Sequence, residues 1–136
     1  RLKRKPRVLV VSIAGVQSTG KSTLINTMFG CQLRTSVGTC TRGVSMLLVS
    51  TSSVWDFVCG TEKPDYTLLL DTEGVCNPLF KNEQWYNWHN IRMTTFAVLA
   101  GDVCILLNNN EDHTIVQDVL PEVMLVYQDV RGTLAK

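Results

Sequence analysis

Residues 15–23 have the types and the spacing that can hold the phosphates of a nucleotide. They read Gly-Val-Gln-Ser-Thr-Gly-Lys-Ser-Thr and match the pattern G-x-x-x-x-G-K-S/T at every fixed position. In such a loop the glycines let backbone N–H groups close on phosphate oxygens, the lysine supplies a cation to the β- and γ-phosphates, and the hydroxyl after it binds Mg²⁺. The sequence therefore predicts a phosphate-binding loop over residues 15–22, and the candidate nucleotide contacts are Gly15, Gln17, Ser18, Thr19, Gly20, Lys21, Ser22 and Thr23.

The flanking residues predict the two elements that such a loop needs. Residues 8–14 are nearly all apolar and rich in β-branched side chains, which favours a strand buried on both faces. Residues 23–29 carry apolar side chains at helical spacing, so we expect a helix that opens at Lys21 and stops at Gly30. The positive end of its dipole would face the phosphates. A glycine turn that binds nothing is the less favoured alternative.

A second candidate group follows a later strand. Strand signals at 44–49 and 66–70, with turn residues at 56–64 between them, predict two antiparallel strands, the first at the sheet edge. The second strand ends in Asp71-Thr-Glu-Gly74. An acid at the carboxyl end of a buried strand lies where open α/β sheets bind ligands, so Asp71 can hold Mg²⁺, usually through water. Gly74 lets its N–H approach a γ-phosphate.

The rest of the chain predicts an α/β protein with a mostly parallel sheet. Residues 31–43 are polar and interrupted by glycines, and they are interpreted as a connection. After residue 76 the sequence pattern predicts a loop at 77–90, a helix at about 89–100, a strand at 102–108 and a last helix at about 114–128.

Single side chains in this part carry further expectations. Thr114 is expected to cap the last helix, and Pro121 to kink it or delay its start. Trp85, Tyr86 and Trp88 are expected to pack their loop onto the body of the protein, an interpretation favoured over stacking on a base. Two histidines lack ligand-like spacing and are expected at the surface: His89 and His113.

The distribution of charge and the spacing of the cysteines disfavour a nucleic-acid-binding, a disulfide-linked and a zinc-binding protein. Residues 1–7 hold five of the 13 basic residues and no acid, which leaves eight basic against 12 acidic residues elsewhere. A solvated lead-in to the first strand is favoured for this run over a nucleic-acid or lipid contact. Five cysteines without a Cys-x-x-Cys pair predict neither disulfides nor a zinc site.

The chain carries no signal for secretion or for a membrane. Its start is too charged for a signal peptide, and its longest nearly apolar stretch, 95–107, is too short for a membrane span. We therefore expect one domain over residues 1–136 in the cytosol, with the nucleus as an alternative.

Three motifs together resemble the G domain of the interferon-inducible very large GTPases and, more distantly, guanylate-binding proteins and atlastins. They are residues 15–30, then Cys40-Thr-Arg-Gly43, then Leu70-Asp-Thr-Glu-Gly74. The resemblance spans nearly the whole chain and implies the three-layer fold of a P-loop G domain that binds GTP and Mg²⁺. It implies that Thr41, in a switch I over about 31–43, contacts Mg²⁺ and the γ-phosphate, and that switch II begins at Asp71. With Lys21, Thr41 would act in catalysis. Self-association through the G domain is also implied.

The chain departs from these relatives at two positions that matter for rate. Ser18 stands where guanylate-binding proteins have an arginine, and Val75 stands where Ras-like enzymes have a glutamine that orients water. Because an arginine finger is worth about 10³ to 10⁵ in rate, intrinsic hydrolysis should be slow. Arg34 and Arg42 are candidates to supply the missing charge.

A third departure concerns the base. Guanine selectivity in G domains comes from an N/T-K-x-D or R-D motif after a fifth strand, and no such motif follows Asn108. Residues 62–65 look similar but precede Asp71. We expect the chain to hold the phosphate-binding part of a G domain, cut before base recognition. The interpretation is a GTP hydrolase, with a non-catalytic, nucleotide-gated interaction module as the alternative and an ATPase or kinase-type protein less favoured.

Overall fold

The computed structural model describes residues 4–33, 43–50, 63–80, 82–109 and 113–134. Four strands form one sheet in the order β2-β3-β1-β4. β1 runs parallel to β3 and to β4, whereas β2 is antiparallel to β3. The predicted α/β fold with a mostly parallel sheet is confirmed, and so is the edge position of the first antiparallel strand. The strands are β1 (Val8–Gly15), β2 (Val44–Ser50), β3 (Tyr66–Thr72) and β4 (Val103–Leu107).

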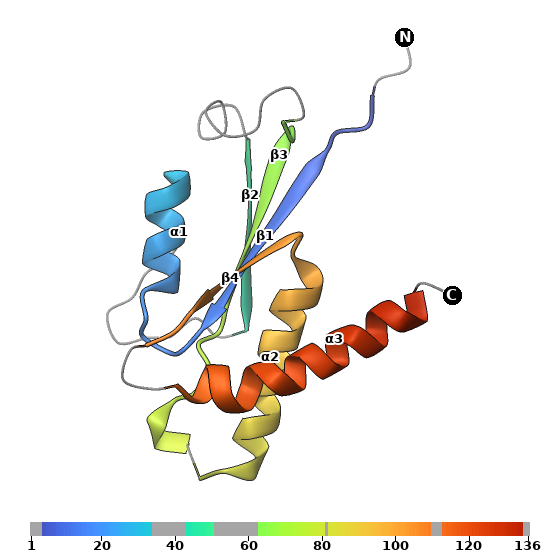
Figure 1. The fold of residues 1–136 in the computed structure, drawn as a ribbon. Helices are drawn as coiled ribbons and strands as arrows, with labels where there is room; N and C mark the ends of the chain where they lie inside the picture. The colour runs from blue at the N-terminus through green and yellow to red at the C-terminus, as the bar shows by residue number, and fades with distance from the viewer. Residues whose placement is uncertain (1–3, 34–42, 51–62, 81, 110–112, 135–136) are drawn as a thin grey trace.

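Helices cover both faces of the sheet, because alternate side chains of β1 point to opposite sides. Val11 and Ile13 join a buried cluster with Ile25 of α1 (Lys21–Phe29). The hydroxyl of Ser12 points the other way and donates a 2.6 Å hydrogen bond to the Ala97 carbonyl of α2 (Gln84–Ala100). Figure 1 shows α1 on one side of the strands, with α2 and α3 (Leu120–Leu134) on the other. α1 has its predicted start at Lys21.

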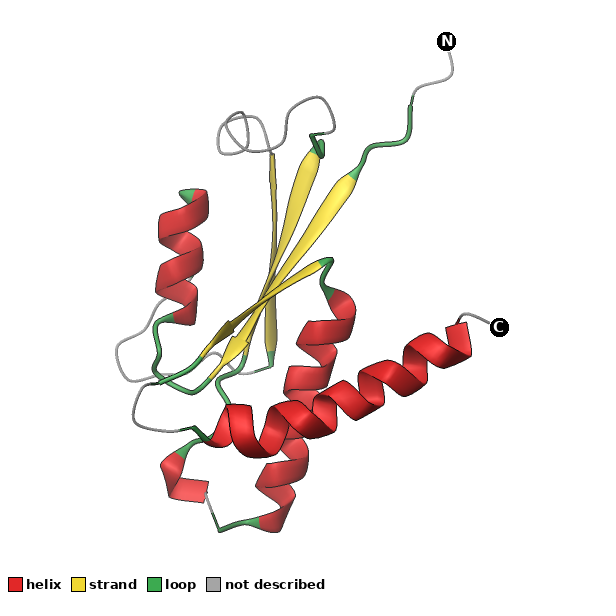
Figure 2. Cartoon of the chain, viewed as in Figure 1, coloured by secondary structure: helices red, strands yellow, loops and turns green. Residues whose placement is uncertain are grey.

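The prediction of a loop at 77–90 is wrong for most of that range. Pro78–Phe80 forms a 3₁₀ turn, and α2 begins at Gln84, five residues earlier than expected (Figure 2). Tyr86 is buried, and its ring centroid lies 5.2 Å from that of Phe80. Burial of this ring overrides the weak helix propensity of the local sequence.

The aromatic residues at the start of α2 divide between the interior and the surface. Tyr86 packs inward as expected, but Trp85 and Trp88 are 56% and 61% exposed. His113 is exposed as expected, whereas His89 is half-buried and stacks on Tyr86 at 5.9 Å between ring centroids.

The last helix is preceded by one wide turn. Ile115–Val119 is π-helical, with the Leu120 N–H bonded to the Ile115 carbonyl, and α3 then runs to Leu134, beyond the predicted end. The wide turn accommodates Pro121, which has no N–H and whose ring would crowd the carbonyl four residues earlier in a regular helix. The helical stretch as a whole begins at Thr114, at its predicted start, and its first turn is π-helical. The predicted cap is wrong, because Thr114 already has helical backbone angles and its side chain makes no capping bond.

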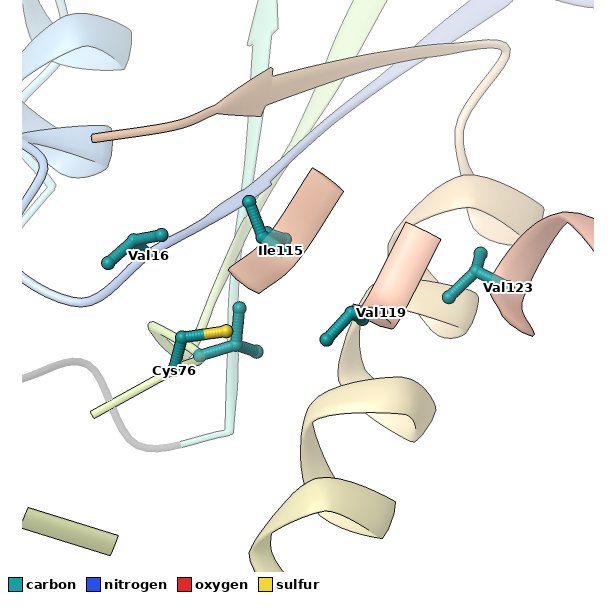
Figure 3. Packing of buried hydrophobic residues seen from close by; sticks show 6 residues of the cluster. Val16, Cys76, Ile115, Val119 and Val123 are labelled. Carbon is teal, nitrogen blue, oxygen red and sulfur yellow. The ribbon is translucent and has the colours of Figure 1, made fainter. Parts of the chain in front are cut away.

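A second buried cluster joins the phosphate-loop side of the sheet to this turn. Figure 3 shows its side chains between the end of β1 and α3. The cluster consists of Val16, Val75, Cys76, Ile115, Val119 and Val123.

Among the described residues, no helix is long and apolar enough to cross a membrane. The described cysteines form no disulfide bond: Cys31, Cys76 and Cys104.

The basic lead-in is tied to the start of β3. Arg4 forms an ion pair with Asp65 at 3.1 Å, and the Arg7 backbone N–H donates to the same carboxylate at 2.7 Å. The hydrogen bond from Arg7, with that from Arg4, lowers the pKa of Asp65 below its ordinary value. Part of the run predicted to be a solvated lead-in therefore neutralises one acid of the body.

Candidate nucleotide-binding site

The phosphate loop leaves β1 beside β4 and turns sharply into α1. Gly15 has φ 152°, and a Cβ there would lie 2.1 Å from the carbonyl oxygen of Leu107, so only glycine fits. The Val16 N–H donates to the same carbonyl at 3.2 Å. Ser18 adopts a left-handed conformation with φ 63°, a strain of about 1–3 kcal/mol that tends to occur at functional sites. The predicted loop over residues 15–22 is thus a tight turn at the carboxyl end of β1.

Lys21 lies at the first position of α1 and reaches back over this loop. Its ammonium donates to the Gly15 carbonyl at 3.2 Å and to the Val16 carbonyl at 2.9 Å, and only 7% of the residue is exposed. The Thr19 hydroxyl bonds the same Val16 carbonyl at 2.7 Å. A buried cation at the positive end of a helix dipole makes this turn favourable for an anion.

Asp71 is brought to the loop by the pairing of β3 with β1. Ile13 lies beside Asp71 in the parallel register, so both strands end at the same edge of the sheet. Asp71 is 1% exposed, and its Oδ2 accepts a 2.5 Å hydrogen bond from the Ser22 hydroxyl. Two of the three side chains predicted to hold Mg²⁺, Ser22 and Asp71, are therefore in direct contact.

The segment after Asp71 packs against the loop through its backbone. A Cβ on Gly74 would lie 2.6 Å from the Cα of Gln17 and 3.0 Å from the Lys21 ammonium, so the absence of a side chain permits this approach. Val75 continues the contact: its N–H donates to the Gly15 carbonyl at 3.1 Å, and its carbonyl accepts from Gln17 at 2.8 Å. Gly74 thus lies beside the Lys21 ammonium.

Sequence reasoning assigned no role to Glu73, which lies between Asp71 and Gly74 in the chain. Its Oε2 accepts a 2.8 Å hydrogen bond from the Gly43 N–H, and its Oε1 lies 3.5 Å from Nε2 of His89. The backbone N–H of Glu73 donates to the Gly43 carbonyl at 2.7 Å. This residue therefore links the start of β2 to α2. The sequence feature that could have indicated a role for Glu73 is its position within the Asp-Thr-Glu-Gly motif.

Two more side chains bind the backbone N–H groups of Cys76 and Asn77. Sequence reasoning did not assign either of them to the site. Oδ1 of Asn90 accepts from the Cys76 N–H at 3.1 Å, and the Tyr86 hydroxyl accepts from the Asn77 N–H at 3.0 Å. Cys76 has a left-handed φ of 57°. Both acceptors come from α2, and the helix predicted at about 89–100 included Asn90 but not Tyr86.

The remaining predicted positions divide into three groups. Val75 is 1% exposed, and its side chain lies in the buried cluster with Val16 and Ile115. Ser18 is exposed at the loop, and Thr23 is exposed on α1. The predicted switch I side chains lie outside the described residues: Arg34, Thr41 and Arg42.

The oxygen atoms at this edge fit Mg²⁺. This hard cation takes oxygen ligands, keeps several waters and uses one or two protein groups together with the phosphates. Ser22 and Asp71 supply a hydroxyl and a buried carboxylate. Across the described ranges, no three or more His, Cys, Asp or Glu side chains cluster where they could hold a metal ion, so a cation here would depend on these two residues and on phosphate oxygens.

Comparisons with known proteins show which sequences this chain is similar to. The chain is 31% identical over 146 residues to interferon-induced very large GTPase 1 of Mus musculus, which covers 96% of this chain and 6% of that protein. It is 40% identical over 75 residues to the up-regulator of cell proliferation of Bos taurus, covering 55% of this chain and 8% of that protein. Guanylate-binding protein 5 of Mus musculus is 43% identical over 70 residues, covering 50% of this chain and 11% of that protein.

The chain thus spans only a small part of each of these relatives. The match to the URGCP-like GTPase domain covers residues 1–131. The predicted resemblance to the very large GTPases and, more distantly, to guanylate-binding proteins is confirmed. This chain belongs to the URGCP-like GTPase domain family.

Proposed function

We propose that this chain binds GTP together with Mg²⁺ and hydrolyses it to GDP and phosphate. The observation that carries the proposal is the convergence of two segments at one edge of the sheet. The Lys21 ammonium, the Ser22 hydroxyl, the Asp71 carboxylate and the Gly74 backbone all belong to the loop or to the segment packed on it. Membership of a GTPase domain family supports the same function.

Each group has one task in this proposal. Backbone N–H groups of residues 15–22 and the Lys21 ammonium hold the phosphate oxygens, and Gly74 N–H contacts the γ-phosphate. Ser22 and Asp71 hold Mg²⁺, which neutralises charge on the phosphates when bound. Thr41 joins them by analogy with the family. Water is the nucleophile, and catalysis consists of positioning and charge neutralisation.

Hydrolysis by the chain alone should be slow. Ser18 supplies no guanidinium, and the buried Val75 cannot orient water. An arginine finger is worth about 10³ to 10⁵ in rate. Arg34 or Arg42 is our candidate for this charge, either within one molecule or across a pair of G domains. An Arg42→Ala chain with the parent rate would eliminate that candidate.

Assembly and location follow from the same family argument. We propose that GTP promotes self-association of this domain and that it acts in the cytosol, with the nucleus as the alternative. Sedimentation of the chain with GDP and with a non-hydrolysable GTP analogue tests the first proposal. Identical molar masses in both states would reject it.

Equilibrium binding of labelled GTP and ATP analogues with Mg²⁺ tests the site. Lys21→Met keeps the buried stem and removes the ammonium, and Lys5→Met, at an exposed position, is the matched control. We expect tight GTP binding that is lost only in Lys21→Met. Equal binding of GTP and ATP would leave phosphate recognition without base selectivity, and no binding would reject the enzyme.

A single-turnover assay then separates hydrolysis from binding. Slow release of phosphate that needs Mg²⁺ and Lys21 would support the GTPase. Binding without any release would favour the alternative, in which the nucleotide only orders loops that present an interaction surface.

A further inference from the structure

We propose that Asn90, assisted by Tyr86, is a positioning residue that sets the place of Gly74 at the phosphate loop and so distinguishes GTP from GDP. This inference rests on the proposed function. It assigns a role in ligand discrimination to α2, which contributes no group to the phosphate loop itself. The argument follows the hydrogen bonds that fix residues 74–77 at both ends.

The first end of this segment is fixed by the phosphate loop. Val75 exchanges two backbone hydrogen bonds with Gly15 and Gln17, at 3.1 and 2.8 Å. These bonds resemble one step of a parallel sheet and hold Gly74 over Gln17. They alone leave the direction of the following peptides undetermined.

The second end is fixed by α2. Asn90 and Tyr86 lie one turn apart on the same helix face, and they are 5% and 6% exposed. Each accepts a hydrogen bond from one peptide, Cys76 at 3.1 Å and Asn77 at 3.0 Å. α2 therefore holds two consecutive N–H groups directly after the loop-bound Val75.

The backbone conformation of Cys76 requires these two hydrogen bonds. Its φ of 57° is a left-handed conformation that costs a non-glycine residue free energy, so the surroundings must enforce it. A pocket of about 360 Å³ lies against this region and is lined in part by Cys76, Asn77, Tyr86 and Asn90. Water can therefore replace a lost side-chain acceptor without restoring the geometry. Release of Cys76 would let Val75 and Gly74 shift away from the loop.

The consequence depends on the γ-phosphate. A displaced Gly74 loses its N–H contact with that group, while the loop and Lys21 still hold the other phosphates. Affinity for a GTP analogue should therefore fall, and affinity for GDP should not. A general loss of structure would lower both.

The test is the ratio of dissociation constants for GDP and GTPγS with Mg²⁺, measured on the full chain. Asn90→Leu has the shape of asparagine without its acceptor and should weaken GTPγS binding about tenfold, the value of a hydrogen bond to a charged group, while GDP binding stays unchanged. Asn90→Asp keeps an acceptor oxygen and should restore the ratio. Asn87→Leu, at an exposed position of the same helix, is the matched control.

Tyr86→Phe keeps the ring packing and removes only the hydroxyl, so it should shift the ratio in the same direction even if Asn90→Leu does not fold. The inference is overturned if both nucleotides weaken equally, if neither weakens, or if Asn90→Asp loses as much as Asn90→Leu. A parent chain without Lys21-dependent binding of either nucleotide would reject the proposed function itself, and this inference with it.

Discussion

The hydroxyl of Ser22 donates a 2.5 Å hydrogen bond to Oδ2 of Asp71, joining the first turn of α1 to the carboxyl end of β3. The two residues are far apart in the chain, and the parallel pairing of β1 with β3 brings them together. Because Ser22 lies in the first turn of a helix and Asp71 near the end of a buried strand, neither can move without disturbing its helix or strand. Their spacing is therefore fixed by the sheet.

Asp71→Asn should weaken GTP binding in the presence of Mg²⁺ by roughly 10- to 100-fold, the usual effect of removing a group that holds a metal through water. The amide oxygen can still accept from Ser22, so the fold should survive. Titrations with Mg²⁺ and with EDTA measure the effect, which should disappear in EDTA. An equal loss in both conditions would show that the carboxylate acts on the fold alone.

Gly74→Ala should damage both stability and nucleotide binding. The new methyl group would meet the backbone of Gln17 at 2.6 Å, and such overpacking costs about 1–3 kcal/mol in the free energy of unfolding. Urea denaturation and GTP titration measure the two effects.

Gly132→Ala is the matched control. A Cβ at this position in α3 meets nothing within 4 Å, so the same substitution should stabilise the helix by about 0.5–1 kcal/mol. If Gly74→Ala were as stable as Gly132→Ala and bound GTP normally, the close packing on the loop would be refuted.

The sequence predicts the local parts of this site well. A buried strand, a glycine loop and a helix are contiguous, so residues 8–29 carry their own signal. The position of Asp71 also follows, because the carboxyl ends of parallel strands meet at one edge of the sheet. These two inferences needed no knowledge of long-range packing.

The parts that were missed depend on contacts between distant segments. α2 begins early because Tyr86 is buried, and its local sequence does not indicate this. The partners of Glu73, Gly43 and His89, come from other elements. Pro121 predicted a disturbance of the last helix, but the sequence does not indicate that it takes the form of a π turn in which Ile115 and Val119 are buried.

The pH dependence of stability should carry a contribution from Asp65. Its pKa is held below the ordinary 3.8, chiefly by the hydrogen bond from the Arg7 N–H and also by Arg4, against the opposing effect of burial. The ionised carboxylate therefore stabilises the fold above that pH, and this contribution is lost as the pH falls through the lowered pKa. Asp65→Asn should be less stable than the parent at pH 7, and the difference should shrink toward acid.

Urea unfolding of both chains across this pH range measures the difference. Asp129→Asn, at an exposed position of α3, is the control and should show no comparable trend. A difference for Asp65→Asn that stays constant down to the most acid pH would contradict the assignment of the contribution to ionisation.

Installing the glutamine of Ras-like enzymes should not create their activity here. Val75→Gln places an amide in the cluster of Ile115 and Val119, where Val75 is 1% exposed. Burial of the polar group and overpacking should together cost about 2–4 kcal/mol of unfolding free energy, without faster single-turnover hydrolysis. Val116→Gln, at a position 45% exposed on the neighbouring turn, should change stability by no more than about 0.5 kcal/mol. A folded Val75→Gln chain that hydrolyses GTP faster than the parent would show that this side chain reaches the phosphates.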